Sequence, residues 1–332
     1  MEINIKSLSV LLILQLFLAT TLIYTGKYRE DGDARGLVIN QTRDNVSQIV
    51  IADDTSEVKL ALRDNVWLVT SESDFPANSD KVTRLLEGIE ELSSQATTVV
   101  AVTEAAQTRF QVASEDYNKR IRVIGTDDRS EELFLGSSPG LDLAHIRKSD
   151  DDAIHVAKFP TYQASSSSSD WIDKSVLKIN SEDIVYMGIG EIVLRRSEKT
   201  EDTVSLNGET SQSNDQQNTT ENQGIWVAEM ESGLDKPLSQ NAAEDLVKQI
   251  ERLRFTDLLE KSEIDQEVKD TLVLRLQLGD GKEMKYSIRK SGNENSYYLV
   301  VSGWDQLFSI GSYTAERLIE AASEEVLFPA DV

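Results

Sequence analysis

The chain of 332 residues is long enough for two domains of ordinary size, and 39% apolar residues are enough to bury a core in each. Its formal net charge of −24 repels phosphate backbones and anionic lipid headgroups, which argues against nucleic-acid binding and peripheral adhesion to membranes. The absence of cysteine excludes disulfides, thiolate catalysis and cysteine-ligated zinc.

The first predicted element is a membrane anchor. Residues 5–24 form an apolar run of about 20 residues, which is long enough to cross a bilayer as one helix. A cleaved signal peptide is the alternative, but no small-residue cleavage pattern follows the run. We therefore expect a transmembrane anchor at residues 1–27 and a juxtamembrane linker at residues 28–45.

The charges around this run leave its orientation open. Lys6, close to the start of this run, stands before the expected helix, whereas Lys27, Arg29 and Arg35 follow it, and the positive-inside rule alone would keep the body in the cytoplasm. Long soluble domains, however, cross the membrane with little regard to flanking charge. We expect a single-pass protein of the inner (cytoplasmic) membrane with its body in the periplasm.

The first α+β unit is predicted at residues 46–160. Short segments that alternate or are rich in β-branched residues, separated by polar turns, predict its strands. A helix is expected to begin near Asn78 or Ser79, both good N-caps, and to carry apolar residues on one face. The strands are expected at residues 48–52, 58–62, 66–69, 109–113, 120–124, 132–135, 144–147 and 153–157.

A serine-rich junction is predicted at residues 161–179, because residues 163–169 (QASSSSS) have the low complexity of a linker. The second α+β unit follows at residues 180–332. Within it, residues 197–224 have almost no apolar content and are expected to form a disordered insertion. Its strands are expected at residues 183–187, 191–195, 225–230, 271–278, 283–288, 297–301 and 306–310, with a terminal helix at 313–325.

The two units share one order of landmarks, which indicates a tandem duplication. Each has a tryptophan-bearing strand, at Trp67 and Trp226, followed by a proline and an amphipathic helix. An offset of 161 residues aligns Pro76 with Pro237 and one apolar helix face with the other. The aligned helix residues are Val82, Leu85, Leu86, Ile89 and Leu92 with Ala243, Leu246, Val247, Ile250 and Leu253. The predicted fold class is α+β, each repeat being a mostly antiparallel sheet with a packed helix.

With these landmarks and the junctional pattern W-x-D-K-x-x-L at Trp171, Asp173, Lys174 and Leu177, the chain resembles a bacterial family called domain of unknown function 4340. The resemblance covers nearly all of the chain after the anchor. It implies an N-terminal membrane segment and an association with transport ATPase and permease components similar to those of gliding-motility systems. It implies no catalytic residues, and the polar insertion departs from the compact pattern of the family.

Few residues are candidates for chemistry. His145 and His155 could form a metal pair across a hairpin, but the repeat aligns them with Tyr298 and Phe308, which favours ordinary sheet positions. The run 150–152 of three aspartates lacks the spacing of a calcium loop and is typical of a solvated turn. The glycine pairs at 188–190 and 279–281 are expected in turns or strand irregularities, and Trp67 and Trp226 in the cores rather than in a ligand site.

We therefore assign no catalytic, cofactor-binding or metal-binding residues and expect no cofactor. The sequence favours a non-enzymatic binding or scaffolding subunit, anchored in the membrane, and the resemblance implies protein partners in an ABC-transporter-like assembly. The alternative is an anchored envelope glycan hydrolase that uses two carboxylates, since 58 acidic residues can always supply a pair. A pocket at the junction of the units that holds two acids, one with a raised pKa, would favour the hydrolase, and an exposed apolar patch without such a pocket would favour the scaffold.

Overall fold

The computed structural model describes residues 39–197, 224–230, 237–259, 270–290 and 296–330, together with the single residues Gln15 and Leu37. The predicted anchor at residues 1–27 thus lies outside the described residues except for Gln15, and the predicted insertion 197–224 lies outside them except at its two ends. Within the described ranges, no helix has both the length and the apolar character needed to span a membrane.

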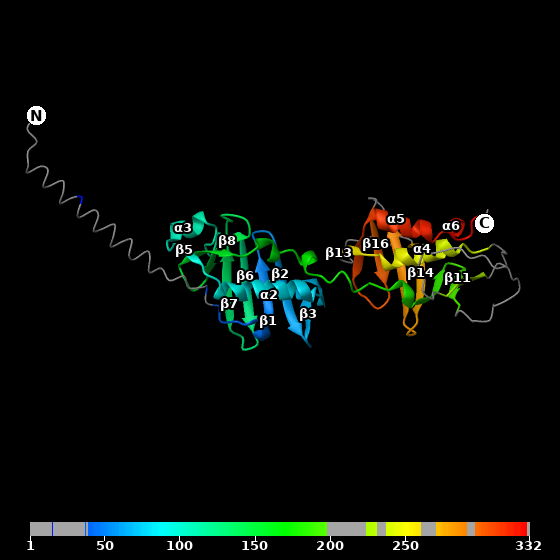
Figure 1. Ribbon diagram of the computed structural model, residues 1–332, viewed down its shortest axis with the longest axis horizontal. Coiled ribbons are helices and arrows are strands. Elements are labelled where there is room, and N and C mark those ends of the chain that lie inside the picture. The colour runs from blue at the N-terminus through cyan, green and yellow to red at the C-terminus, as the bar shows by residue number, and fades with distance from the viewer. Residues whose placement is uncertain are drawn as a thin grey trace, which may run out of the picture. The chain divides into compact units, whose positions relative to one another are not determined.

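The chain divides into two compact units, residues 1–173 and 174–332, and each is built on an antiparallel sheet (Figure 1). The first sheet has nine strands in the order β4-β3-β2-β1-β6-β7-β8-β9-β5, and the second has eight in the order β12-β11-β10-β14-β15-β16-β17-β13. Apart from the two-residue strand β4, the two orders correspond strand for strand. This correspondence agrees with a tandem duplication, and the α+β class with antiparallel sheets is confirmed.

In the first unit, α2 (Ser79–Ser94) lies against the sheet and α3 (Glu104–Arg109) follows the edge strand β5 (Figure 1). Asp64 and Asn65, between β2 and β3, both have positive φ angles of 49° and 63°, as a two-residue hairpin turn requires. The strands are β1 (Val46–Ala52), β2 (Glu57–Arg63), β3 (Val66–Val69), β4 (Phe75–Pro76), β5 (Thr98–Ala101), β6 (Lys119–Gly125), β7 (Ser130–Leu135), β8 (Leu143–Lys148) and β9 (Ile154–Lys158).

In the second unit, α4 (Gln240–Glu251) is the counterpart of α2, and α5 (Ser312–Ala321) and α6 (Glu324–Leu327) pack beside it. The strands are β10 (Ile184–Ile189), β11 (Ile192–Arg196), β12 (Trp226–Met230), β13 (Phe255–Leu259), β14 (Asp270–Leu278), β15 (Glu283–Lys290), β16 (Tyr297–Val301) and β17 (Leu307–Ile310).

The two equivalent helices begin at the expected N-caps, and their predicted apolar faces are buried. The side chains of Asn78 and Ser239 accept hydrogen bonds from the N–H groups of Lys81 and Ala242, which caps α2 and α4 in the same way. All ten aligned apolar residues are buried. The helical periodicity of the sequence therefore predicted both helix–sheet contacts correctly.

Three secondary-structure predictions are corrected. Residues 109–113 do not form a strand: Arg109 ends α3, and Val112 makes only an isolated bridge with Tyr117. The edge strands β5 and β13, which pair with β9 and β17, were not predicted. The terminal helix is broken where Ser323 takes an extended conformation, and this break lets Leu327 and Phe328 turn inward and become buried.

The serine-rich segment is not a free linker but the closing segment of the first unit. Ala164, Ser166, Trp171 and Ile172 are buried, and Ile172 forms a bridge with Ala77. The N–H of Asn78, the cap of α2, donates to the carbonyl of Trp171 at 2.7 Å. In the second unit, the N–H of Ser239 donates to the carbonyl of Leu327 at 2.9 Å. Residues 161–173 in the first unit thus correspond to the helices α5 and α6 in the second. Each closing segment lies beside the start of the equivalent helix, which is α2 in the first unit and α4 in the second.

Candidate functional site

The two histidines lie on neighbouring strands but on opposite faces of the sheet. In the register of β8 and β9, His145 is opposite Val156, whereas His155 is opposite Ile146. Residues opposite each other share a face, and consecutive residues alternate between faces, so the two imidazoles point away from each other. The structure therefore does not bring these two candidate residues together, and no group of three potential metal ligands occurs among the described residues.

Each histidine instead has its own local partners. His145 Nδ1 is 2.7 Å from the carbonyl oxygen of Ser137, and its ring stacks on Phe110 with centroids 4.1 Å apart. His155 Nδ1 is 2.8 Å from Thr97 Oγ1. Burial lowers the pKa of His155, and the negative charge of Asp151, which raises it, offsets only part of this effect. Both imidazoles are buried parts of the sheet's side-chain packing, as their alignment with Tyr298 and Phe308 predicts.

The three aspartates at residues 150–152 form the turn between β8 and β9. Asp150 Oδ2 lies 3.4 Å from Lys148 Nζ, Asp151 Oδ1 accepts from the N–H of Ala153, and Asp152 Oδ1 accepts from Gln107. Each carboxylate thus interacts with a different neighbour. The three carboxylates therefore belong to a turn that their own contacts stabilise, as the sequence predicts for residues 150–152.

Arg147, which the sequence did not single out, is buried behind this turn. Its Nε donates to the carbonyl of Val112 at 2.8 Å and its Nη1 to the carbonyl of Asp151 at 3.1 Å, while the guanidinium lies 4.7 Å from the ring centroid of Phe134. Burial lowers the pKa of Arg147, whereas the charges of Asp152 and Asp151 raise it. Arg147 stabilises the turn from inside.

The tryptophans and three of the four glycines lie where the sequence predicts, whereas Gly188 lies inside β10 and pairs in register with Val193 and Arg275. Gly190 and Gly281 occupy hairpin turns with φ angles of +58° and +86°, a region that favours glycine. Trp67 and Trp226 are both buried in the cores. Trp226 Nε1 donates to Glu244 at 3.0 Å, and Arg196 lies over the indole ring at 4.8 Å. Neither indole is presented as a platform for a ligand.

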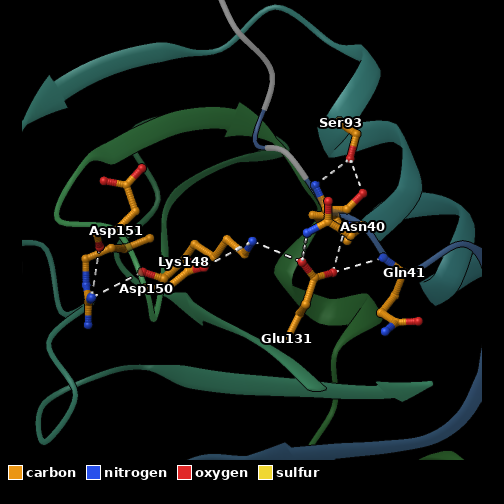
Figure 2. A network of polar contacts seen from close by, with 9 residues as sticks. Asn40, Gln41, Ser93, Glu131, Lys148, Asp150 and Asp151 are labelled. Atoms are coloured by element: carbon orange, nitrogen blue, oxygen red, sulfur yellow. Dashed lines mark hydrogen bonds and ion pairs between the residues drawn. The ribbon is translucent and has the colours of Figure 1, made fainter. Parts of the chain in front are cut away.

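A polar network among the described residues is centred on Glu131 of β7 (Figure 2). Its Oε2 accepts hydrogen bonds from the N–H groups of Asn40 and Gln41, at 2.8 and 3.0 Å, and its Oε1 accepts one from the Asn40 side chain. Lys148 Nζ lies 3.0 Å from Oε1. Glu131 thereby holds the segment that precedes β1 onto the middle of the sheet, and Ser93 of α2 holds the neighbouring residue Ile39.

Burial alone would raise the pKa of Glu131, but the hydrogen bonds from Gln41, Lys148 and Asn40 and the charge of Lys148 outweigh it, so the pKa is lowered. A carboxyl group with a lowered folded-state pKa stabilises the fold above its unfolded pKa, and this stabilisation is lost as pH falls through the folded pKa. The Glu131 contribution is therefore fully present at pH 7 and disappears in acid, below the unfolded value of about 4.3.

We expect Glu131→Gln to lower the free energy of unfolding by about 2 kcal/mol at pH 7, because it removes the closer and less exposed of the two carboxylates that pair with the half-buried Lys148. Urea unfolding followed by circular dichroism at several pH values measures this. The difference from the wild type should shrink between pH 5 and pH 3. An equal loss at pH 3 and pH 7 would show that the ion pair is not its cause.

The edge strand β5 exposes apolar side chains. Val99 and Val100 in the strand are each 42% exposed, and Val102 directly after it is 60% exposed. Residues 95–103 contain no charged side chain, although 28% of the chain is charged. Because β5 is the last strand of the sheet, its outer backbone groups face away from β9. Such an edge is a template for pairing with another strand.

The corresponding edge of the second unit is protected. Its last strand, β13, carries the exposed Asp257 and follows Arg254. Charged residues on an edge strand are a common means of preventing strand-to-strand association. The strands β5 and β13 thus occupy equivalent positions, but only β13 carries a charged residue that blocks association. The fold therefore does not require the uncharged edge of the first unit.

These features define the class of protein: an α+β protein of two units with corresponding antiparallel sheets, whose described residues contain buried structural histidines and an open apolar sheet edge. The chain belongs to the family described as Domain of unknown function (DUF4340), whose model matches residues 67–275, more than half of the chain. The match begins at Trp67 and includes the junctional pattern at Trp171. Comparison with curated proteins and with solved structures gave no significant match.

Proposed function

We propose that the chain is a non-enzymatic binding or scaffolding subunit, anchored in the inner membrane with its body in the periplasm, that serves an ABC-transporter-like assembly. The spanning-length apolar run at residues 5–24 supports the anchor. The resemblance of the chain to its family supports the association with transport components. The observation that carries the scaffolding role is the open, uncharged edge at β5, since exposed apolar surfaces of this kind mark protein interaction sites.

The glycan-hydrolase alternative has less support. A general acid needs a carboxyl group with a raised pKa. Among the described residues, the two carboxyl groups with a displaced pKa are Asp53 and Glu131, and both are shifted downward. The hydrogen bond from Ser166, with those from Thr55 and Ser56, lowers the pKa of Asp53. Both groups are therefore ionised hydrogen-bond acceptors, the opposite of what a proton donor requires.

The scaffolding proposal is tested by Val100→Lys, which introduces a charge into the open edge. We expect proteins that co-purify with the wild type from detergent-solubilised membranes to decrease at least tenfold with this variant, as measured by quantitative mass spectrometry. Thr256→Lys on the exposed part of β13 is the matched control and should retain them. Unchanged partners with Val100→Lys, or release of soluble glycan fragments by the purified wild-type protein, would contradict the proposal.

A further inference from the structure

A cavity in the first unit lies between the first turns of α2 and the closing segment 161–173. Its volume is about 210 Å³, and Lys81, Arg84, Tyr162, Ser165, Asp170 and Trp171 line it. Sites for drug-sized ligands have volumes of roughly 300 to 1,000 Å³. The cavity is therefore of a size for one amino-acid-sized group rather than for a nucleotide or a large cofactor.

Two aromatic side chains line this cavity in different ways. Trp171 is 2% exposed, and its indole is fixed because Nε1 donates to the carbonyl of Ser165 at 2.8 Å. Tyr162 is 75% exposed, an unusual position for an aromatic ring. A rigid indole wall and an accessible phenol ring favour a ligand with an apolar or aromatic body.

The charges of the cavity favour a single negative charge on the ligand. Lys81 and Arg84 lie one turn apart on α2, and Lys81 Nζ donates to the carbonyl of Asp170 at 2.6 Å. Arg84 makes no hydrogen bond or ion pair with any residue that the structure describes, although the chain has a net charge of −24. The Asp170 carboxylate, which accepts from Ser165 Oγ, offsets one of the two cations. The remaining charge of +1 matches a monoanion better than a phosphate dianion.

The second unit shows that these cations are not needed to build the fold. At the offset of 161 residues, Lys81 corresponds to Ala242 and Arg84 to Asp245. Both helices nevertheless begin with the same cap and contact their closing segments through the same backbone hydrogen bond. The helices also differ outside the cavity, as at Glu87 and Lys248, but the loss of both cavity-lining cations in the second unit shows that this fold does not require them, which leaves them available for binding.

We propose that this cavity binds a carboxylate on an apolar or aromatic body of about the size of one amino acid. Arg84 and Lys81 hold the carboxylate, for which the planar fork of arginine is well suited, and Trp171 and Tyr162 contact the body. The same chemistry is presented by a free organic acid and by the C-terminal residue of a polypeptide. The inference does not depend on the scaffolding role of β5.

Isothermal titration calorimetry of the full-length protein tests the proposal with four probes: N-acetylphenylalanine, its amide, and a tetrapeptide ending in phenylalanine with a free or an amidated C-terminus. We expect an acid to bind and the corresponding amide to bind at least tenfold more weakly. Binding of N-acetylphenylalanine identifies a free acid as sufficient, and binding of the free tetrapeptide alone identifies a polypeptide terminus. Equal binding of acid and amide, or no binding of any probe, would overturn the proposal.

The variant Arg84→Asp, which copies the second unit, should weaken binding of the acid at least tenfold. Lys248→Asp, on the exposed face of α4, is the matched charge-reversal control and should leave binding unchanged. Intrinsic fluorescence locates the bound probe, because the wild-type response should disappear in Trp171→Phe. Retention of full affinity by Arg84→Asp, or a fluorescence response that survives in Trp171→Phe, would place the ligand elsewhere.

Discussion

Replacing Trp171 with alanine is expected to lower the stability of the first unit by about 4 kcal/mol, the usual cost of truncating a buried tryptophan. The indole is almost fully buried, and its segment closes the unit against the start of α2. Urea unfolding followed by far-ultraviolet circular dichroism measures the loss. A linker residue would show no such effect, so the variant distinguishes a closing segment from a spacer.

Two controls sharpen this experiment. Tyr162→Ala removes a neighbouring aromatic ring that is mostly in solvent and should cost less than about 0.5 kcal/mol. Leu327→Ala removes the buried counterpart in the second unit and should cost about 3 kcal/mol. A neutral Trp171→Ala, or a Tyr162→Ala that is equally destabilising, would show that the segment does not close the unit as described.

Leu86→Asp and Val247→Asp are expected to unfold their respective units, with a loss of several kcal/mol in each case. Leu86 is 4% exposed and Val247 is 0% exposed, at aligned positions on α2 and α4. Either substitution places a carboxylate in an apolar contact without a partner, which is among the most destabilising single changes. Thermal unfolding followed by circular dichroism should show the loss of one transition in each variant.

Conservative variants separate the charge from the change of shape. Leu86→Met conserves side-chain volume and should cost less than about 1.5 kcal/mol, whereas Val247→Ile adds one methylene group to a buried site and should cost about 1 to 3 kcal/mol. If one aspartate variant unfolds a unit and the other has no effect, the two helices do not occupy equivalent cores.

The elements with strong periodicity could be predicted from the sequence, and those set by tertiary pairing could not. The helix faces of α2 and α4 repeat at 3.6 residues, and the hairpin β14–β15 alternates at two, so a local pattern determines each of them. The short edge strands β5 and β13 have no such pattern. β5 is mostly exposed on both faces and is a strand because β9 offers it hydrogen-bond partners.

Composition was misleading at the serine-rich segment. Serine runs are typical of linkers because they bury little apolar surface, yet Trp171, Ile172 and Ala164 supply enough of it to fix the segment against α2. The cavity beside Trp171 depends on this docking, so the sequence could not predict that Lys81, Arg84 and Tyr162 line one site. The one signal that was available is the replacement of Lys81 and Arg84 by Ala242 and Asp245 in the aligned repeat.

The contacts of Glu131 also determine how the folded body bears mechanical load. A pull on the chain before residue 39 reaches the hydrogen bonds of Asn40 and Gln41 with Glu131, and of Ile39 with Ser93, before it reaches β1. The tension is therefore shared between β7 in the middle of the sheet and the last turn of α2. Strand β1, which pairs on both sides with β2 and β6, is shielded from being peeled out of the sheet from its N-terminal end.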